Sequence, residues 1–121
     1  RITIPNAEIS FIKLSSYEGM KSSGKIRKLI GINSNISGRN IILLEDIVDT
    51  GNTLEKIIEL LTQEKIISIK VATLLFKPEA YKKDIHIHYI GKSIENDFVV
   101  GYGLDYDEIG RNLPHIYKLK N

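Results

Sequence analysis

The chain has 121 residues, enough for one domain or part of one, and its 42% hydrophobic and 26% charged residues are ordinary for a globular protein. The formal net charge is only +2 and the lysines are spread along the chain, which argues against a nucleic-acid binder and against an acidic disordered tail. Without cysteine there is no disulfide framework or cysteine nucleophile, and no apolar stretch is long enough to cross a membrane.

The first part of the chain is predicted to form a hairpin. Apolar and polar residues partly alternate over Ala7–Leu14, which predicts a strand. Ser15–Gly24 is rich in serine and glycine and poor in apolar residues, so we expect an exposed, mobile loop or a plain hairpin tip. Lys25–Ile30 is the predicted return strand, and Asn33–Asn40 is a turn region.

The middle of the chain predicts a strand, a helix and a second strand. The short apolar run Ile41–Leu44 is typical of a parallel strand that is buried on both faces. Apolar residues then recur at helical spacing, which predicts a helix over Thr53–Gln63 with Asn52 and Thr53 as capping residues. Ile66–Phe76 is the next buried strand, so the three elements form a βαβ unit with parallel pairing and a right-handed crossover.

Three further strands are predicted, over Ile85–Ile90, Phe98–Val100 and Leu113–Leu119, the last at an edge because Pro114 lies near its start. No repeat or linker divides the chain, so we expect one domain over residues 1–121. The predicted class is α/β, with an open, mostly parallel sheet and flanking helices. Ligands bind such sheets at the carboxyl ends of the strands.

The most informative segment is IILLEDIVDTGNT, from Ile41 to Thr53. The predicted strand brings Glu45 and Asp46 to the carboxyl edge of the sheet, where two adjacent carboxylates accept hydrogen bonds from neighbouring ribose hydroxyls or hold a hard divalent cation. Asp49–Thr53 (DTGNT) then closes a tight loop onto a helix N-terminus, which favours an anion. Glycine lets the backbone approach that anion, and the threonines add hydroxyl donors. The segment therefore predicts a phosphate site.

An acid inside this loop is unusual, because a bound phosphate beside Asp49 is unfavourable and raises the pKa of its carboxyl. Such a cost indicates a role in proton transfer. The alternative is that Asp49 only caps the helix, while Glu45 and Asp46 are solvated loop charges. For the whole string after a buried strand, we favour the functional interpretation.

The same string resembles the signature for 5-phosphoribosyl 1-diphosphate (PRPP) of type I phosphoribosyltransferases: an apolar strand, two acids, two apolar residues and Asp-Thr-Gly-x-Thr. Two other segments are similar to hypoxanthine-guanine phosphoribosyltransferases. These are FIKLSSYEGMKSSGKI, like the mobile loop of that family, and NDFVVGYGLDYDEIGRNLP, like its base-binding and C-terminal segment. The lysine that follows VATLLF, Lys77, also matches that family. The resemblance runs from about Ile9 to Tyr117.

For PRPP, the resemblance implies that Glu45 and Asp46 bind the ribose hydroxyls, directly or through Mg2+. It implies that Asp49 is the general acid/base at purine N7. The 5′-phosphate is expected to lie against the loop formed by Asp49, Thr50, Gly51, Asn52 and Thr53.

For the base and pyrophosphate, the resemblance implies that Lys77 donates to the purine 6-oxo group, Phe98 stacks on the base and the Val99 backbone contacts its edge. Asp105 is expected to bind a second Mg2+, and Arg111 to pair with pyrophosphate. Ser16 and Tyr17 are implied to close over the site as a flexible lid.

The residues themselves support part of this assignment. Lys77 follows a buried strand, Pro78 favours an extended conformation there, and a lysine is only a donor, which suits a carbonyl better than an amino group. Alternatives remain open: Lys77 as a surface lysine, Phe98 as a core residue and Arg111 as a surface residue. His86 and His88 share a strand face, where a half-exposed strand pair is favoured over a two-histidine metal site.

The expected function is purine salvage: hypoxanthine or guanine reacts with PRPP to give IMP or GMP and pyrophosphate, with Mg2+ as cofactor. The alternative is a regulator on the same fold that senses PRPP or purines. We expect a cytoplasmic homodimer or homotetramer that contacts neither nucleic acid nor membranes. Because the chain opens on Arg1 and the family's N-terminal segment is not recognised, we expect that segment to be missing.

Overall fold

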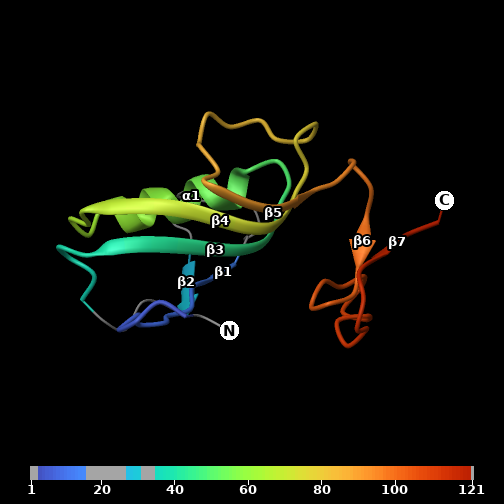
Figure 1. Ribbon diagram of the computed structural model, residues 1–121, viewed down its shortest axis with the longest axis horizontal. Helices are drawn as coiled ribbons and strands as arrows, with labels where there is room; N and C mark the ends of the chain where they lie inside the picture. Colours follow the sequence, from blue (N-terminus) through green and yellow to red (C-terminus); the bar gives the residue numbers. More distant parts are fainter. Residues whose placement is uncertain (1–2, 16–26, 31–34, 121) are drawn as a thin grey trace. The chain divides into compact units, whose positions relative to one another are not determined.

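The computed structural model of the chain describes residues 3–15, 27–30 and 35–120 (Figure 1). The contacts divide the chain into two compact units, residues 1–37 and 38–121. Each unit is considered by itself below, and the second contains the βαβ region singled out in the sequence.

The first unit contains an antiparallel pair, β1 (Lys13–Ser15) and β2 (Arg27–Ile30), with an irregular register between Lys13 and Leu14. The predicted hairpin is confirmed, but the predicted first strand over Ala7–Leu14 is wrong for most of its length. The segment before Lys13 is exposed apart from Ile12, and it pairs with no strand of the described part, so alternation alone was a poor guide. The predicted lid residues Ser16 and Tyr17 lie outside the described residues.

The second unit is built on a parallel sheet of three strands in the order β3-β4-β5. These are β3 (Asn40–Val48), β4 (Ser68–Phe76) and β5 (Tyr89–Ser93), and helix α1 (Asn52–Thr62) connects the first two (Figure 1). The predicted α/β class with parallel pairing is therefore confirmed. In the described residues, α1 is the helix that packs on this sheet.

Apolar side chains between α1 and the sheet form the core of this unit. Val48, Leu54, Val71 and Ile87 are buried together. Five half-buried residues complete the cluster: Leu43, Ile58, Phe76, Tyr81 and Ile85. Because Val48 and Leu54 flank the turn between β3 and α1, the core fixes both ends of that turn.

Two predicted boundaries around this turn need correction. Strand β3 continues past Leu44 to Val48, since Ile47 and Val48 pair with the end of β4, so Glu45 and Asp46 lie within the strand. Helix α1 is capped by Gly51, which has a φ of 87° and no side-chain capping bond, so Asn52 is its first residue and not its cap. The left-handed backbone at Gly51 allows this sharp entry.

The third parallel strand begins four residues later than predicted, at Tyr89. Ile85 and Ile87 pack into the core without joining the sheet. His88 donates its backbone N–H to the Val71 carbonyl, and its Nδ1 accepts the Val71 N–H at 3.1 Å. The rings of His86 and His88 meet edge to face, with their centroids 4.7 Å apart. The side chain of His88 thus replaces a backbone partner at the start of this pairing.

The last part of the chain forms an antiparallel pair, β6 (Val99–Val100) and β7 (Tyr117–Lys118). Both strands are shorter than predicted, and they form a sheet of their own instead of adding an edge to the parallel sheet. Between them the backbone is left-handed at several non-glycine residues, including Tyr102, Asp107 and Glu108. Gly101 is enclosed, since an added Cβ would lie 2.1 Å from the His115 carbonyl oxygen.

Within the described residues, no helix has the length and apolar character needed to cross a membrane.

Candidate functional site

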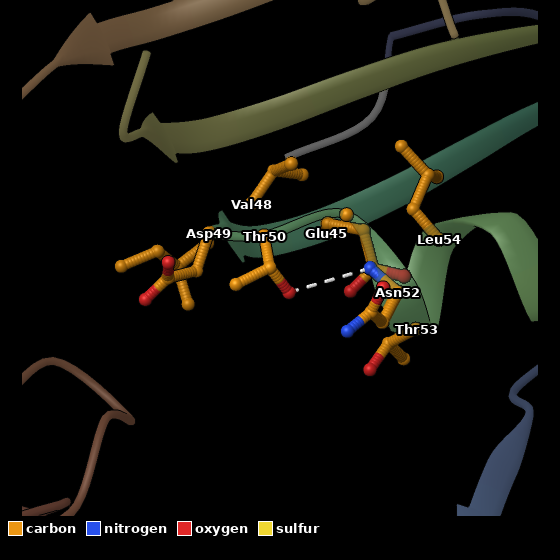
Figure 2. A pocket seen from close by; sticks show the side chains of 9 residues that line it. Glu45, Val48, Asp49, Thr50, Asn52, Thr53 and Leu54 are labelled. Atoms are coloured by element: carbon orange, nitrogen blue, oxygen red, sulfur yellow. Dashed lines mark hydrogen bonds between the residues drawn. The ribbon is translucent and has the colours of Figure 1, made fainter. Parts of the chain in front are cut away.

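The turn from β3 into α1 lines a pocket at the carboxyl end of the strand (Figure 2). The residues that line it come from one stretch of chain, in which only Asp46 is left out. They are Glu45, Ile47, Val48, Asp49, Thr50, Gly51, Asn52, Thr53 and Leu54. The predicted phosphate loop therefore forms a concave surface.

The backbone of this turn suits an anion. Gly51 accepts the Glu55 N–H at 3.0 Å, which starts the helical hydrogen bonds. The N–H groups before Glu55 belong to the first turn, where a helix has no acceptors of its own and its dipole favours negative charge. Thr50 Oγ1 lies 3.5 Å from the Asn52 nitrogen, and the Thr53 side chain is exposed beside it (Figure 2). The threonine hydroxyls and the first backbone amides of α1 thus line the same pocket.

The two neighbouring acids of β3 behave differently. Glu45 lines the pocket, and its pKa is raised to about 7, first by burial and then by the charge of Asp46. Asp46 is exposed, is not among the residues that line the pocket, and accepts the Ile47 N–H at 2.7 Å. Adjacent residues of a strand point to opposite faces, which explains the difference.

Asp49 and Lys77, 28 residues apart, meet at this edge of the sheet. The Lys77 Nζ lies 3.1 Å from Asp49 Oδ2, and the side chains are 8% and 47% exposed. Lys77 also donates its backbone N–H to the Val48 carbonyl, directly after β4. The interpretation of Lys77 as a surface lysine is therefore wrong. A buried ammonium needs a charged partner, and here the partner is Asp49, the acid predicted to transfer a proton.

The predicted base-binding residue Phe98 is 50% exposed, so its interpretation as a core residue is wrong. Its ring meets the Tyr106 ring edge to face, with centroids 5.6 Å apart. Val99 pairs with Lys118 of β7. Lys118 in turn contacts Asp97, the residue before Phe98, at 2.5 Å. The contacts of Phe98 and of its two neighbours in the chain thus fix the position of this half-exposed residue.

The last two predicted residues are paired with each other. Arg111 lies 2.9 Å from Asp105 Oδ1 and donates to the Gly103 carbonyl at 2.8 Å. The other Asp105 oxygen accepts the Glu108 N–H at 2.9 Å. These contacts bring the two residues together in one loop. Their assigned partners, a cation and pyrophosphate, stay predictions.

No three acidic, histidine or cysteine side chains gather into a metal-binding group in the described ranges. Mg2+ does not require three, because it keeps several waters and is often held by one or two carboxylates together with substrate phosphates. The half-buried carboxyl of Glu45 fits such a cation, since a nearby positive charge offsets the burial that raises its pKa.

The segment that packs behind the turn was not predicted from the sequence. An added Cβ on Gly51 would lie 2.6 Å from the Tyr81 ring and 2.7 Å from Lys83 Cγ. Lys82 donates its backbone N–H to the Thr50 carbonyl at 3.1 Å. These residues follow β4 without a periodic pattern, and only the folded chain brings them to the glycine.

Comparisons with known proteins agree with this geometry. A family model described as the phosphoribosyl transferase domain matches residues 2–107. The hypoxanthine-guanine phosphoribosyltransferase of Staphylococcus epidermidis is 47% identical over 113 residues, which is 93% of this chain and 63% of that protein. The chain thus spans less than two thirds of the length of this relative.

Solved structures give the same result. The hypoxanthine phosphoribosyltransferase of Staphylococcus aureus is 46% identical, with a TM-score of 0.81 over 91% of this chain and 60% of that chain. A variant of the Trypanosoma cruzi hypoxanthine phosphoribosyltransferase, complexed with the product IMP, is 38% identical, with a TM-score of 0.81 over 91% and 56% of the two chains.

Proposed function

The chain belongs to the phosphoribosyl transferase domain family, and from that premise we propose that its protein converts hypoxanthine or guanine and PRPP to IMP or GMP and pyrophosphate. The observation that carries the proposal is the meeting of Asp49 with Lys77 beside the pocket of the β3–α1 turn. The acid proposed for proton transfer, the donor proposed for a carbonyl and the turn proposed for the phosphate then lie at one edge of the sheet.

The turn is proposed to hold the 5′-phosphate of PRPP and of the product. Support comes from the N-terminus of α1, where backbone N–H groups and the helix dipole favour an anion. Thr50 and Thr53 add hydroxyl donors to these amides, and Glu45 lines the same pocket. In this proposal Glu45 accepts a hydrogen bond from a ribose hydroxyl inside the pocket. Asp46 lies on the other face of β3, so its exposed carboxylate has to turn toward the pocket to accept one from the neighbouring hydroxyl.

The base is proposed to lie between Lys77 and Phe98. The Lys77 ammonium has only donors, so it suits the 6-oxo group of hypoxanthine or guanine and opposes the amino group of adenine. Phe98 offers an exposed face for stacking, and its neighbour Val99 offers backbone groups at the edge of the base. The relatives are named for hypoxanthine and guanine, which supports a 6-oxopurine as the base.

In the reaction that we propose, purine N9 attacks ribose C1, the bond from C1 to the pyrophosphate oxygen breaks, and the purine loses its N7 proton. Asp49 accepts that proton, for which a carboxylate within hydrogen-bonding reach of N7 is required. Before the base arrives, the ion pair with Lys77 holds the Asp49 side chain at this edge of the sheet. Arg111 is proposed to release Asp105 and to pair with the departing pyrophosphate.

We further propose that Mg2+ is the cofactor, with Glu45 and Asp46 on the ribose side and Asp105 on the pyrophosphate side as its protein ligands. When bound, the cation neutralises and orients the phosphate groups of the substrate. A location in the cytoplasm, a homodimeric or homotetrameric state and lid closure by Ser16 and Tyr17 stay predictions from the sequence.

The test is an assay of hypoxanthine, guanine, xanthine and adenine side by side with PRPP and Mg2+. We expect nucleotide and pyrophosphate from hypoxanthine or guanine and little or none from adenine. If the whole protein, and not only the present chain, binds PRPP and gives no product from any base, the regulatory alternative replaces the enzyme. Equal turnover of adenine would instead refute the role of Lys77.

A further inference from the structure

Lys83 and Glu55 form a charge pair beside the phosphate turn that the assignment of the site does not use. The Lys83 Nζ lies 2.5 Å from Glu55 Oε2, and the side chains are 22% and 42% exposed. Glu55 is the acidic residue in the first turn of α1. The Lys83 stem lies against Gly51, as shown by the 2.7 Å between its Cγ and an added glycine Cβ.

The position of Glu55 opposes the chemistry of the turn. A carboxylate in the first turn stabilises an isolated helix, because it interacts with the N-terminal dipole. An incoming phosphate uses the same dipole and the same end of the helix, so an unpaired carboxylate there repels it. An offset of the charge of Glu55 therefore favours phosphate binding.

Lys83 is placed to offset that charge, and the surrounding contacts hold it there. The Tyr81 hydroxyl donates to the Ile85 carbonyl at 2.7 Å, and the Tyr81 ring packs against Phe76. The Lys82 N–H holds the Thr50 carbonyl at 3.1 Å. The segment that carries the ammonium is thus joined by hydrogen bonds and packing to the turn and to the end of β4.

We propose that Lys83 is a positioning residue for phosphate affinity, which acts by neutralising Glu55 while its stem supports the Gly51 turn from behind. This proposal rests on the proposed function, because it concerns the 5′-phosphate site of the same pocket. It predicts opposite effects of the two charges: loss of Lys83 weakens phosphate binding, and loss of Glu55 strengthens it.

The experiment measures binding of IMP and of inosine, which lacks the phosphate, to purified protein at low ionic strength. Lys83→Met is expected to weaken IMP binding about 3- to 10-fold, and Glu55→Gln to strengthen it about 2- to 5-fold, with inosine unchanged. The double variant Lys83→Met/Glu55→Gln is expected to return within about 2-fold of the wild type, and all differences shrink with added salt. Lys70→Met, which removes an exposed lysine near the start of β4, is the charge control.

A merely structural salt bridge gives a different pattern, because either single change then weakens binding and the double change restores nothing. That pattern, or an equal effect on inosine, would overturn the proposal. Glu55→Gln retains the Lys83 stem and so tests the idea even where Lys83→Met fails to fold. If the wild type binds neither IMP nor PRPP, the proposed function fails first; if it binds both and the charges have no opposite effects, only the role of Lys83 fails.

Discussion

At the scale of residues, the pair of Asp49 and Lys77 connects the proposed phosphate side of the pocket with the proposed base side. Each residue alone has an ordinary explanation, such as a loop charge or a lysine at the end of a strand. Their contact removes those explanations, because an 8% exposed ammonium is costly unless an acid neutralises it. The pair therefore gives a direct test of the proposed chemistry.

Asp49→Asn is expected to reduce kcat by about 10²- to 10⁴-fold, the usual contribution of a general acid or base, while PRPP binding survives. The amide keeps an oxygen for Lys77 but removes the neutralising charge, so urea unfolding of the variant is measured as well, to separate lost stability from lost catalysis. Turnover with hypoxanthine and the dissociation constant of PRPP measure the two effects. Glu64→Gln, an exposed charge just after α1, serves as the control. Full activity of Asp49→Asn would refute the acid/base role.

Glu45 predicts a dependence of stability on pH. Its pKa is raised from 4.5 to about 7 in the folded protein, so between these values the folded state binds more protons than the unfolded state. The free energy of unfolding therefore falls as pH rises through this window and is level above it. Because Glu45 is only partly buried, we expect a loss on the order of 1–2 kcal/mol.

Urea unfolding of the wild type and Glu45→Gln at pH 5 and pH 8 measures this loss. The neutral variant should lack the part of the decline that belongs to Glu45, so the difference between the two proteins should grow in its favour at pH 8. A constant difference at both values would show that the Glu45 carboxyl titrates normally.

At the scale of elements, the turn between β3 and α1 depends on glycine for two separable reasons. Gly51 needs a left-handed backbone, and it also has no room for a Cβ beside Tyr81 and Lys83. Gly38 shares the first property, with a φ of 71°, but has nothing within 4 Å of an added Cβ. The two glycines therefore form a matched pair.

Gly38→Ala is expected to cost on the order of 1 kcal/mol, the strain of a left-handed alanine. Gly51→Ala should cost about 1–3 kcal/mol more, because the ring of Tyr81 and the stem of Lys83 must move. It should also weaken IMP binding, whereas Gly38→Ala should not. Denaturant unfolding and IMP titration of both variants check this; equal costs would mean that the turn tolerates the displacement.

The elements also show what was predictable from the sequence. Apolar periodicity found α1 to within one residue at each end, and the apolar runs found β3 and β4. The predicted burial of β3 on both faces is wrong, because Ile42 and Leu44 are 47% and 62% exposed. The predicted start of the third parallel strand was wrong because tertiary contacts decide it. The apolar Ile85 and Ile87 pack on the core instead of pairing in the sheet.

The site followed the same division. The DTGNT string predicted the pocket because its residues are contiguous in the chain. The pairing of Asp49 with Lys77 was implied only by the order of the strands, and that of Asp105 with Arg111 was not expected. The support of Gly51 by Tyr81 and Lys83 depends on a segment that lacks any periodic or charge signal.

At the scale of the whole molecule, every proposed ligand contact except the lid falls in the second unit, residues 38–121. A product nucleotide should therefore stabilise that unit by binding its folded form alone. At 100 times the dissociation constant, the gain in free energy of unfolding is about 2.7 kcal/mol. In the proposed site, the 6-oxo group of IMP accepts from the Lys77 ammonium, whereas the amino group of AMP would oppose it, so the two nucleotides should differ strongly in affinity.

Thermal unfolding with equal concentrations of IMP and AMP tests this expectation. IMP should raise the midpoint by several degrees, and AMP much less, because at the same concentration it occupies fewer sites. Lys77→Met should abolish most of the difference between the nucleotides. It should leave much of the contribution of the phosphate, because the proposed phosphate donors, Thr50, Thr53 and the first amides of α1, do not include Lys77, although Asp49 of the turn loses its partner. If IMP and AMP raised the unfolding midpoint of the wild type equally, the protein would recognise the phosphate and not the base. The assignment of a 6-oxopurine to this pocket would then be wrong.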